Sequence, residues 1–164
     1  MTTFQDAKDS FYVALRNQLA VLNPDRTTTV RGAVRPAVVV AENELQPGDG
    51  NPPLDTFVLH WFATAVDTSE AIPLEHARCE IRVSTAGSPE VAGMDRGRTL
   101  AAMRAELDVM LAPGQAVKTS HAGASAIEAA TPVFWSTAAG EQVKETPGEL
   151  RMLCAVEVFA WREP

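Results

Sequence analysis

Three histidines and two cysteines are the side chains of this 164-residue chain best suited to chemistry near neutral pH. His76 and Cys79 lie three residues apart, which prompts a search for a metal site. A zinc site needs three or four converging ligands, and no second pair of recognisable spacing accompanies them. The strand expected from Ala77 to Ser84 would also place the two on different elements or opposite faces. We therefore expect no metal site.

The remaining candidates for catalysis are also better explained by structure. Ser120 and His121 are adjacent, which is poor geometry for a nucleophile and its base, because the two must meet through the fold. His60 follows strand-forming residues beside Trp61, which favours a half-buried histidine bonded to a backbone carbonyl. The glycines between Gly87 and Gly97 lack the Gly-Lys-Ser/Thr of a phosphate loop. We expect no enzyme activity and no cofactor.

The charge balance argues against binding to nucleic acid. The chain has 14 basic and 21 acidic residues, a net charge of −7, and no clustered basic run. Specific binding to duplex DNA requires clustered Lys and Arg that neutralise phosphates. No stretch reaches the roughly 20 apolar residues needed to cross a bilayer, and no signal peptide is visible at the N-terminus. We expect no specific nucleic-acid binding, no membrane partner, and folding in a cytoplasm.

Two amphipathic stretches predict helices. Apolar residues recur at helical spacing from Phe4 to Leu22, and Thr3 followed by Asp6 resembles a capping box. A second stripe follows Asp95, which we expect to cap the helix that runs to Leu111. This stripe consists of Leu100, Met103, Leu107, Met110 and Leu111.

Strand-like runs account for much of the remaining chain. The run from Ala77 to Ser84 alternates cleanly, which predicts one buried and one solvated face. Residues 25–34 are interpreted as a loop or a short edge strand. The other predicted strands are 36–41, 56–66, 132–137 and 150–161.

Two connections are longer than usual. Residues 42–55 contain Pro-Gly-Asp-Gly-Asn-Pro-Pro, and residues 112–131 are rich in Ala, Gly, Ser and Thr, so both are predicted to be loops. Loops of this length are generally functional or disordered. The pattern as a whole predicts a single α+β domain over residues 1–164, with a mixed, mainly antiparallel sheet packed against two main helices.

A charged strand face is the first candidate contact surface. Arg78, Glu80 and Arg82 alternate in sign on the solvated side of the predicted strand. Such a stripe is commonly a solvated face, and it is also what subunits use when complementary charges meet. We do not expect one core to hold all of Trp61, Phe62, Trp135, Phe159 and Trp161. The candidate subunit-interface residues are therefore Arg78, Glu80, Arg82 and Trp161.

The order of these elements resembles the tail terminator and tail-completion (neck) proteins of tailed bacteriophages, which also occur in phage-like contractile injection particles. The resemblance covers most of the chain at the level of pattern. In such proteins a mixed sheet packs against helices, and identical subunits close into a ring, commonly a hexamer, that caps the tail tube. The segments that carry the resemblance are Phe11–Ala20, Arg35–Val40, Cys79–Val83, Asp95–Leu107 and Val158–Trp161.

The resemblance implies a structural virion protein that ends tube polymerisation and forms a docking surface for the head or neck. The partners it implies are copies of this chain, the tail tube protein, and head–tail connector or neck and sheath proteins. It places the protein in the tail or neck of the virion, after assembly in the host bacterial cytoplasm. Ring size, contractile or non-contractile tail, and phage or domesticated particle stay open.

Two other functions remain open at this point. One is a small ligand-binding or enzymatic α+β domain with a pocket near His60, Trp61 and His121. The other is an adaptor that binds a single protein partner as a monomer.

Overall fold

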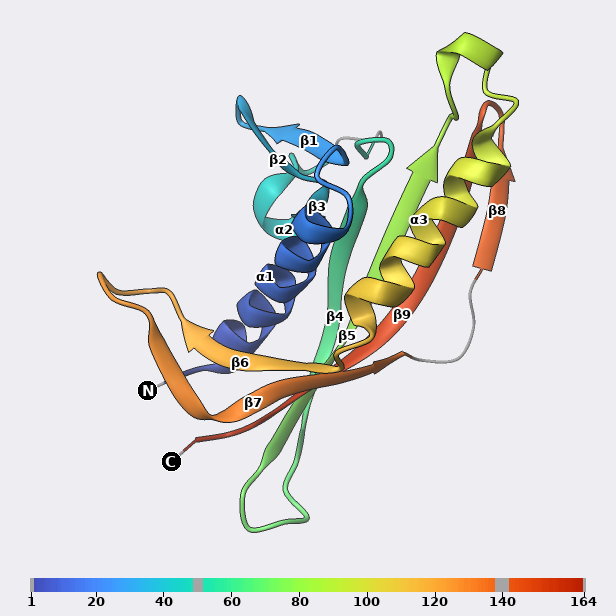
Figure 1. Ribbon diagram of the computed structural model, residues 1–164. Helices are drawn as coiled ribbons and strands as arrows, with labels where there is room; N and C mark the ends of the chain where they lie inside the picture. Colours follow the sequence, from blue (N-terminus) through green and yellow to red (C-terminus); the bar gives the residue numbers. More distant parts are fainter. Residues whose placement is uncertain (1, 49–51, 138–141, 164) are drawn as a thin grey trace.

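Two helices lie on one side of a strongly curved sheet in the computed structural model (Figure 1). The structure describes residues 2–48, 52–137 and 142–163. The helices are α1 (Phe4–Leu22), the single turn α2 (Ala41–Glu44) and α3 (Arg96–Leu111), with a 3-10 turn η1 at Pro89–Val91. The strands are β1 (Thr27–Val30), β2 (Ala33–Pro36), β3 (Val38–Val40), β4 (Phe57–Asp67), β5 (Leu74–Thr85), β6 (Gln115–Ser120), β7 (Ile127–Thr137), β8 (Gln142–Thr146) and β9 (Glu149–Trp161).

The large sheet has the order β3-β4-β5-β9-β7-β6, and β8 also pairs with β9. The β3–β4 pair is parallel and the other pairs are antiparallel. β9 is long enough for two strands to share one of its edges, because β8 pairs with residues 149–153 and β7 with residues 156–160. This arrangement confirms the predicted α+β class and the mixed, mainly antiparallel sheet.

The core lies between the helices and one face of the sheet. Ala77, Cys79, Ile81 and Val83 of β5 are buried, as their alternation predicts, and β9 contributes alternate residues from Met152 to Ala160. All five residues of the predicted α3 stripe are buried. Helix α1 contributes Phe11, Leu15 and Leu19. One-sided amphipathic elements that share a single apolar interior are what the sequence pattern requires.

The two helix starts differ. In α1 the Thr3 hydroxyl accepts from the Asp6 N–H and the Asp6 carboxylate accepts from the Thr3 N–H, so the predicted capping box is confirmed. In α3 the expected side-chain cap is wrong. Asp95 occupies the cap position, but its Oδ1 accepts from the Ser88 N–H at 2.7 Å. The carboxylate therefore closes the loop before the helix.

A glycine makes that loop possible. Gly93 has φ +74°, and a Cβ there would lie 2.5 Å from the Ala86 carbonyl oxygen. Any larger residue would clash with this backbone and adopt a conformation that L-residues rarely hold. The loop that carries η1 thus returns tightly to α3.

The predicted loop at 112–131 is wrong, because it contains β6 and the start of β7. These strands pair with each other, and the Ser10 hydroxyl of α1 accepts from the Thr119 N–H at 2.8 Å. The segment gains strand structure from these distant partners and not from its weak alternation. Of residues 25–34, all from Thr27 onward lie within the β1–β2 hairpin, whose turn residues Arg31 and Gly32 both have positive φ, as a tight type I′ turn requires.

The other predicted loop, 42–55, begins within α2, and its remaining described residues up to Asp55 lie outside helices and strands. Residues 49–51 of this prediction lie outside the described residues.

A buried lysine joins the two ends of the chain. Lys118 is 2% exposed, donates to the Trp161 carbonyl at 3.0 Å and lies 3.8 Å from the Glu163 carboxylate. Thr2 and Thr131 also donate to Glu163. A buried charge must be paired and hydrogen-bonded to be tolerated. This cluster therefore holds the N-terminus, β6, β7 and the end of β9 together.

We predict that Leu107→Ala lowers the free energy of unfolding by about 2–5 kcal/mol, because Leu107 is fully buried in α3 and its truncation leaves a cavity. Val109→Ala is the matched control, since Val109 lies on the exposed side of the same helix. Its effect should stay within about 0.5 kcal/mol. Urea unfolding followed by circular dichroism measures both. Equal effects would show that the two faces of α3 are not distinct.

Candidate interaction surface

The sheet has a second face that neither α1 nor α3 covers, called here the open face. Side chains alternate along β5 and β9, and those that do not point to the helices point to this face. Arg78, Glu80 and Arg82 of β5 and Trp161 of β9 all lie on it, because their strand neighbours Cys79, Ile81 and Ala160 are buried in the core. The structure therefore brings the four predicted interface residues to one face.

The charged stripe on the open face is partly paired within itself. Glu80 lies between the two arginines, with Arg82 Nη2 at 2.9 Å and Arg78 Nε at 3.8 Å from its carboxylate oxygens. The arginine side chains remain 48% and 47% exposed, whereas Glu80 is 17% exposed. Surface ion pairs of this kind contribute at most about 1 kcal/mol. The two guanidinium groups thus remain available to a partner.

Aromatic rings gather at the other end of the open face. Phe134 of β7 stacks on Phe159 of β9 with ring centroids 5.4 Å apart, and the His76 ring lies 5.6 Å from Phe159. Trp161 lies further along β9 on the same face and is half-buried. These rings form a patch on the open face and take no part in the core below the helices.

Other aromatic residues pack toward the helices. Trp135 is 7% exposed, and its Nε1–H donates to the Leu111 carbonyl at 3.0 Å. Trp61 packs edge-on against Phe11 of α1, with centroids 5.7 Å apart. The five aromatic residues singled out in the sequence are thus divided, and Phe62, Phe159 and Trp161 lie outside the core cluster.

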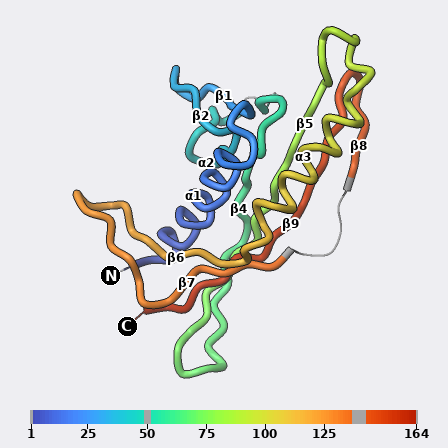
Figure 2. The backbone as a smooth tube through the Cα atoms, viewed as in Figure 1, coloured from blue at the N-terminus to red at the C-terminus, as the bar shows by residue number. Residues whose placement is uncertain are grey.

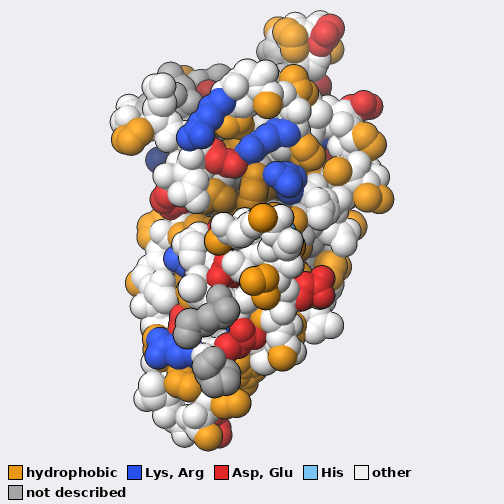
Figure 3. All heavy atoms as spheres, turned by 90° about the vertical axis from the view of Figure 1, so that its left-hand side faces the viewer, with side chains coloured by type: hydrophobic (Ala, Val, Ile, Leu, Met, Phe, Trp, Pro, Cys, Tyr) orange, Lys and Arg blue, Asp and Glu red, His pale blue; other side chains and the backbone are white. Residues whose placement is uncertain are grey.

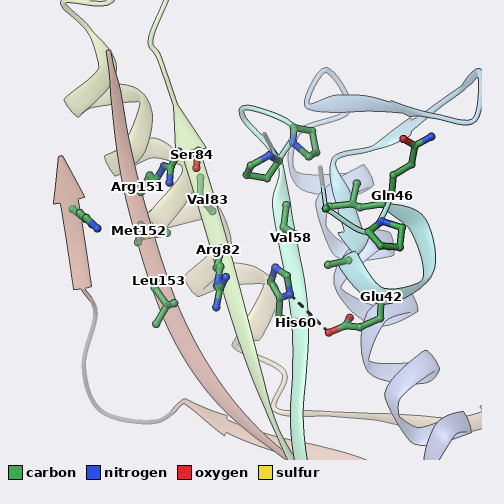
Figure 4. Close-up of a pocket in the computed structure, with 17 residues that line it drawn as sticks. Glu42, Gln46, Val58, His60, Arg82, Val83, Ser84, Arg151, Met152 and Leu153 are labelled. Atoms are coloured by element: carbon green, nitrogen blue, oxygen red, sulfur yellow. Dashed lines mark ion pairs between the residues drawn. The ribbon is translucent and has the colours of Figure 1, made fainter. Parts of the chain in front are cut away.

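A groove of about 740 Å³ runs across the open face beside α2 (Figure 4). Val58 of β4 and Leu153 of β9 contribute apolar side chains to it. Arg82, Arg151 and Lys144 supply positive charge from β5, β9 and β8. The opposite wall is formed by α2 and the chain that follows it, including Glu42, Leu45, Gln46, Pro47, Pro52 and Pro53.

His60 points into this groove toward Glu42, and its Nδ1 lies 3.8 Å from a Glu42 carboxylate oxygen (Figure 4). Burial and the nearby Arg82 guanidinium lower the pKa of His60 below 6.5, and the Glu42 charge only partly opposes them. His60 is therefore neutral at pH 7. The same Glu42 carboxylate accepts from the Trp61 N–H at 2.9 Å, which ties α2 to β4.

The pocket predicted near His60, Trp61 and His121 is not formed. His60 lines the groove on the open face, whereas Trp61 packs under α1. His121 lines a separate hollow of about 340 Å³ beside α1 and α2, together with Tyr12 and Arg16. The curvature of the sheet and the placement of β6 beside α1 separate these residues, which sequence proximity alone could not reveal.

His76 and Cys79 lie on opposite faces of β5, as the alternation predicted. Within residues 2–48, 52–137 and 142–163, no three His, Cys, Asp or Glu side chains are grouped to hold a metal. Cys79 and Cys154 are both buried, and burial raises the pKa of Cys79 well above its usual value. None of the described helices is long and apolar enough to cross a membrane.

Sequence reasoning missed Arg151, Lys144 and Leu153 as residues that line a groove. The alternation of Glu149, Arg151 and Leu153 indicates one polar-containing face of β9, but only the strand order places that face beside Arg82. Figure 3 shows another side of the molecule, where basic side chains form small groups separated by apolar and acidic ones. That side carries no continuous basic stripe of the kind duplex DNA requires.

Comparisons with known proteins leave the family open. No protein-family model matches the chain, and no curated protein matches it at a significant level. Among solved structures, one similar chain belongs to a structure described as "Virion of native gene transfer agent (GTA) particle". The two chains are 16% identical with a TM-score of 0.41, and the alignment covers 95% of this chain and 98% of that chain. A likeness of this degree carries no argument about function.

We predict that His60→Gln reduces the loss of stability on acidification. Because the folded-state pKa of His60 lies below its unfolded value, the unfolded chain takes up the proton first, and stability falls as pH drops through about 6.5. The glutamine variant lacks this contribution. Urea unfolding of both proteins at pH 7.5 and pH 5.5 should show the smaller loss in the variant. Equal losses would mean that His60 titrates alike in both states.

Proposed function

We propose that this chain is a structural protein of a tailed phage or a related tube-based particle, and that copies of it close into a ring on the tail tube. The observation that carries the proposal is the open sheet face, with a charged end and an aromatic end, together with the β4–β5 hairpin that continues beyond the rest of the sheet (Figure 2). Such a surface gives one subunit several separate places to contact the next.

The β4–β5 hairpin extends away from the helices, whereas the β6–β7 hairpin runs past the start of α1, to which β6 is bonded through Thr119 and Ser10 (Figures 1 and 2). They expose apolar side chains without a core of their own: Phe62, Val66 and Ile72 on or near the first, and Val117 and Ile127 on the second. Among the described residues, the only strand that pairs with β4 beyond Leu59 is β5, and on the other edge the Trp61 N–H donates to the Glu42 carboxylate. Exposed apolar side chains and an unpaired strand edge favour association with another chain.

Contacts made by a hairpin and received by a different surface are heterologous. Heterologous contacts generate a closed ring when the rotation from one subunit to the next permits closure. The acidic balance of the chain, with a net charge of −7, also suits a channel through which DNA must slide without sticking.

The type of particle and the position of the ring on the tail tube are proposed from the resemblance to tail terminator and tail-completion proteins. The segments that carry it correspond to α1, the β2–β3 region, β5, α3 and the end of β9. On this proposal the ring is a hexamer that stops tube polymerisation and offers a docking surface to connector, neck or sheath proteins. The protein then resides in the tail or neck of the virion and acts without catalysis.

A second candidate function is the binding of a small molecule in the groove. The observation that favours it is a concave site of about 740 Å³ that joins a neutral His60, three cations and apolar side chains. A ligand that binds only the folded state raises the melting temperature. A thermal-shift screen with metabolites, in which an anionic compound stabilises the protein and Arg82→Ala removes the effect, would support this candidate over ring assembly.

We predict that the purified protein forms a closed oligomer whose mass is a multiple of 17.6 kDa and which binds isolated tail-tube rings. Arg78→Glu should raise the concentration at the midpoint of assembly by roughly tenfold, because it reverses an exposed charge on the open face. Arg98→Glu makes the same charge change on an exposed position of α3 and should leave assembly unaltered.

Mass photometry and sedimentation velocity across a concentration series measure this prediction. A chain that stays strictly monomeric at high concentration and does not associate with tube rings would remove the proposed function. Equal effects of the two variants would show that Arg78 is not at the subunit contact.

A further inference from the structure

The turn that joins β4 to β5 is acidic and apolar, and we call residues 66–73 the acidic tip. It carries Asp67 and Glu70 beside the exposed Val66 and Ile72, and it contains no Lys or Arg. Asp67 Oδ1 accepts from the Ser69 N–H at 2.9 Å, which shapes the turn. This hydrogen bond also lowers the pKa of Asp67, so the tip is negatively charged at neutral pH.

The groove on the open face has the opposite charge. Lys144 stands directly opposite Arg151 in the β8–β9 ladder, and like charges in that position repel. Arg82 adds a third cation from the next row, where it pairs with Leu153. Glu42 is the acidic residue among the described groove residues. An incoming carboxylate would therefore relieve the repulsion between the cations.

The arginines of the groove have partners on their own strands, but these leave much of each side chain in solvent. Arg82 pairs with Glu80 at 2.9 Å and Arg151 with Glu149 at 3.2 Å. Their side chains are 47% and 44% exposed. Guanidinium groups have five N–H donors and can bind a further carboxylate while the first pair persists.

The groove also contains apolar surface that a small anion would not use. This surface comes from Leu153 and from three prolines on the opposite wall, while Val58 lies beneath it and is only 2% exposed. The acidic tip is complementary to the groove in charge and in apolar surface. Its carboxylates match the cations of the groove, and its exposed Val66 and Ile72 match the apolar lining.

The tip and the groove lie at opposite ends of the same two strands. Val58 and Arg82 pair near one end of the β4–β5 ladder, whereas Asp67 pairs with Leu74 at the other (Figure 1). Eight residues of strand separate Arg82 from Leu74, which corresponds to roughly 26 Å. A chain cannot place its own tip in its own groove.

We infer that the groove of one copy of this chain receives the acidic tip of the next copy, as the repeating head-to-tail contact of the ring. The inference rests on the proposed function, which it deepens by naming the two surfaces that meet. Because each copy has one tip and one groove, the same contact repeats around the ring until it closes.

Charge reversal on each surface tests this contact. The tip variant is Asp67→Lys with Glu70→Lys, and the groove variant is Lys144→Glu with Arg151→Glu. Each should weaken assembly by about tenfold or more. The milder Asp67→Asn with Glu70→Gln preserves a side-chain acceptor for the turn and should weaken assembly in the same direction. The control, Arg98→Glu, reverses an exposed charge on α3 outside both surfaces and should assemble as the wild type does.

Mixing the two reversed variants gives the sharper result. In the mixture the intact groove of the tip variant receives the intact tip of the groove variant, and the lysine tip of the first chain matches the acidic groove of the second. Both contacts can therefore form between unlike chains, so the expected product is an oligomer in which the two variants alternate, whereas each variant alone assembles weakly. A chain that carries all four reversals has complementary surfaces again and should regain the full oligomer. Circular dichroism and thermal melts confirm that each variant is folded.

The outcomes separate this inference from the proposed function. If the wild type forms a ring that binds tube rings while the tip and groove variants assemble normally, the tip–groove contact is overturned and the ring remains. If the groove variant keeps its ring but no longer binds tube rings, the groove serves a different protein and the inference is again overturned. A monomeric wild type removes both.

Discussion

The pairing of β5 with β9 is the constraint on which the rest of the structure depends. The two strands are in register from Leu74 opposite Trp161 to Thr85 opposite Leu150 without a bulge. A slip of one residue would turn every side chain to the other face. In the observed register Ile81 and Cys154 meet below the helices, while Arg78 and Glu157 meet on the open face. The core and the candidate interaction surface are therefore two results of one ladder.

The ends of that ladder are held by different interactions. At one end the Lys118 cluster fixes the last residues of β9. A hydrogen bond from Thr2 lowers the pKa of Glu163, so its carboxylate stays charged to receive that bond. The Trp161 carbonyl accepts from Lys118 in this cluster, and this bond fixes the position of Trp161 beside the aromatic patch. At the other end β8 shares the edge of β9 with β7 and brings Lys144 opposite Arg151. A chain that associates through both ends of its sheet would use these two features for different contacts.

Much of the fold could be predicted where residues interact with near neighbours in sequence. The α1 capping box, the α3 stripe and the alternation of β5 were all confirmed. The predictions that are wrong concern segments whose structure depends on contacts with residues far away in the sequence. β6 forms because β7 and the Ser10 hydroxyl satisfy its backbone hydrogen-bonding groups. The Asp95 carboxylate accepts from the Ser88 N–H and therefore does not cap α3. The pocket expected at His60, Trp61 and His121 fails for the same reason, since neither the turn of the sheet nor the position of α1 is encoded in local spacing.

By itself the sequence determined which segments are helical or extended, which of their faces are apolar, and that charge alternates along one strand, because periodicity and capping act over a few residues. Only the tertiary structure decided that the groove takes its cations from β5, β8 and β9, and that the acidic tip lies at the far end from it. Strand order and register depend on pairings between residues far apart in the chain, and hydrophobic alternation is equally compatible with many such pairings. The arrangement of surfaces is thus a property of the folded sheet and not of any one segment.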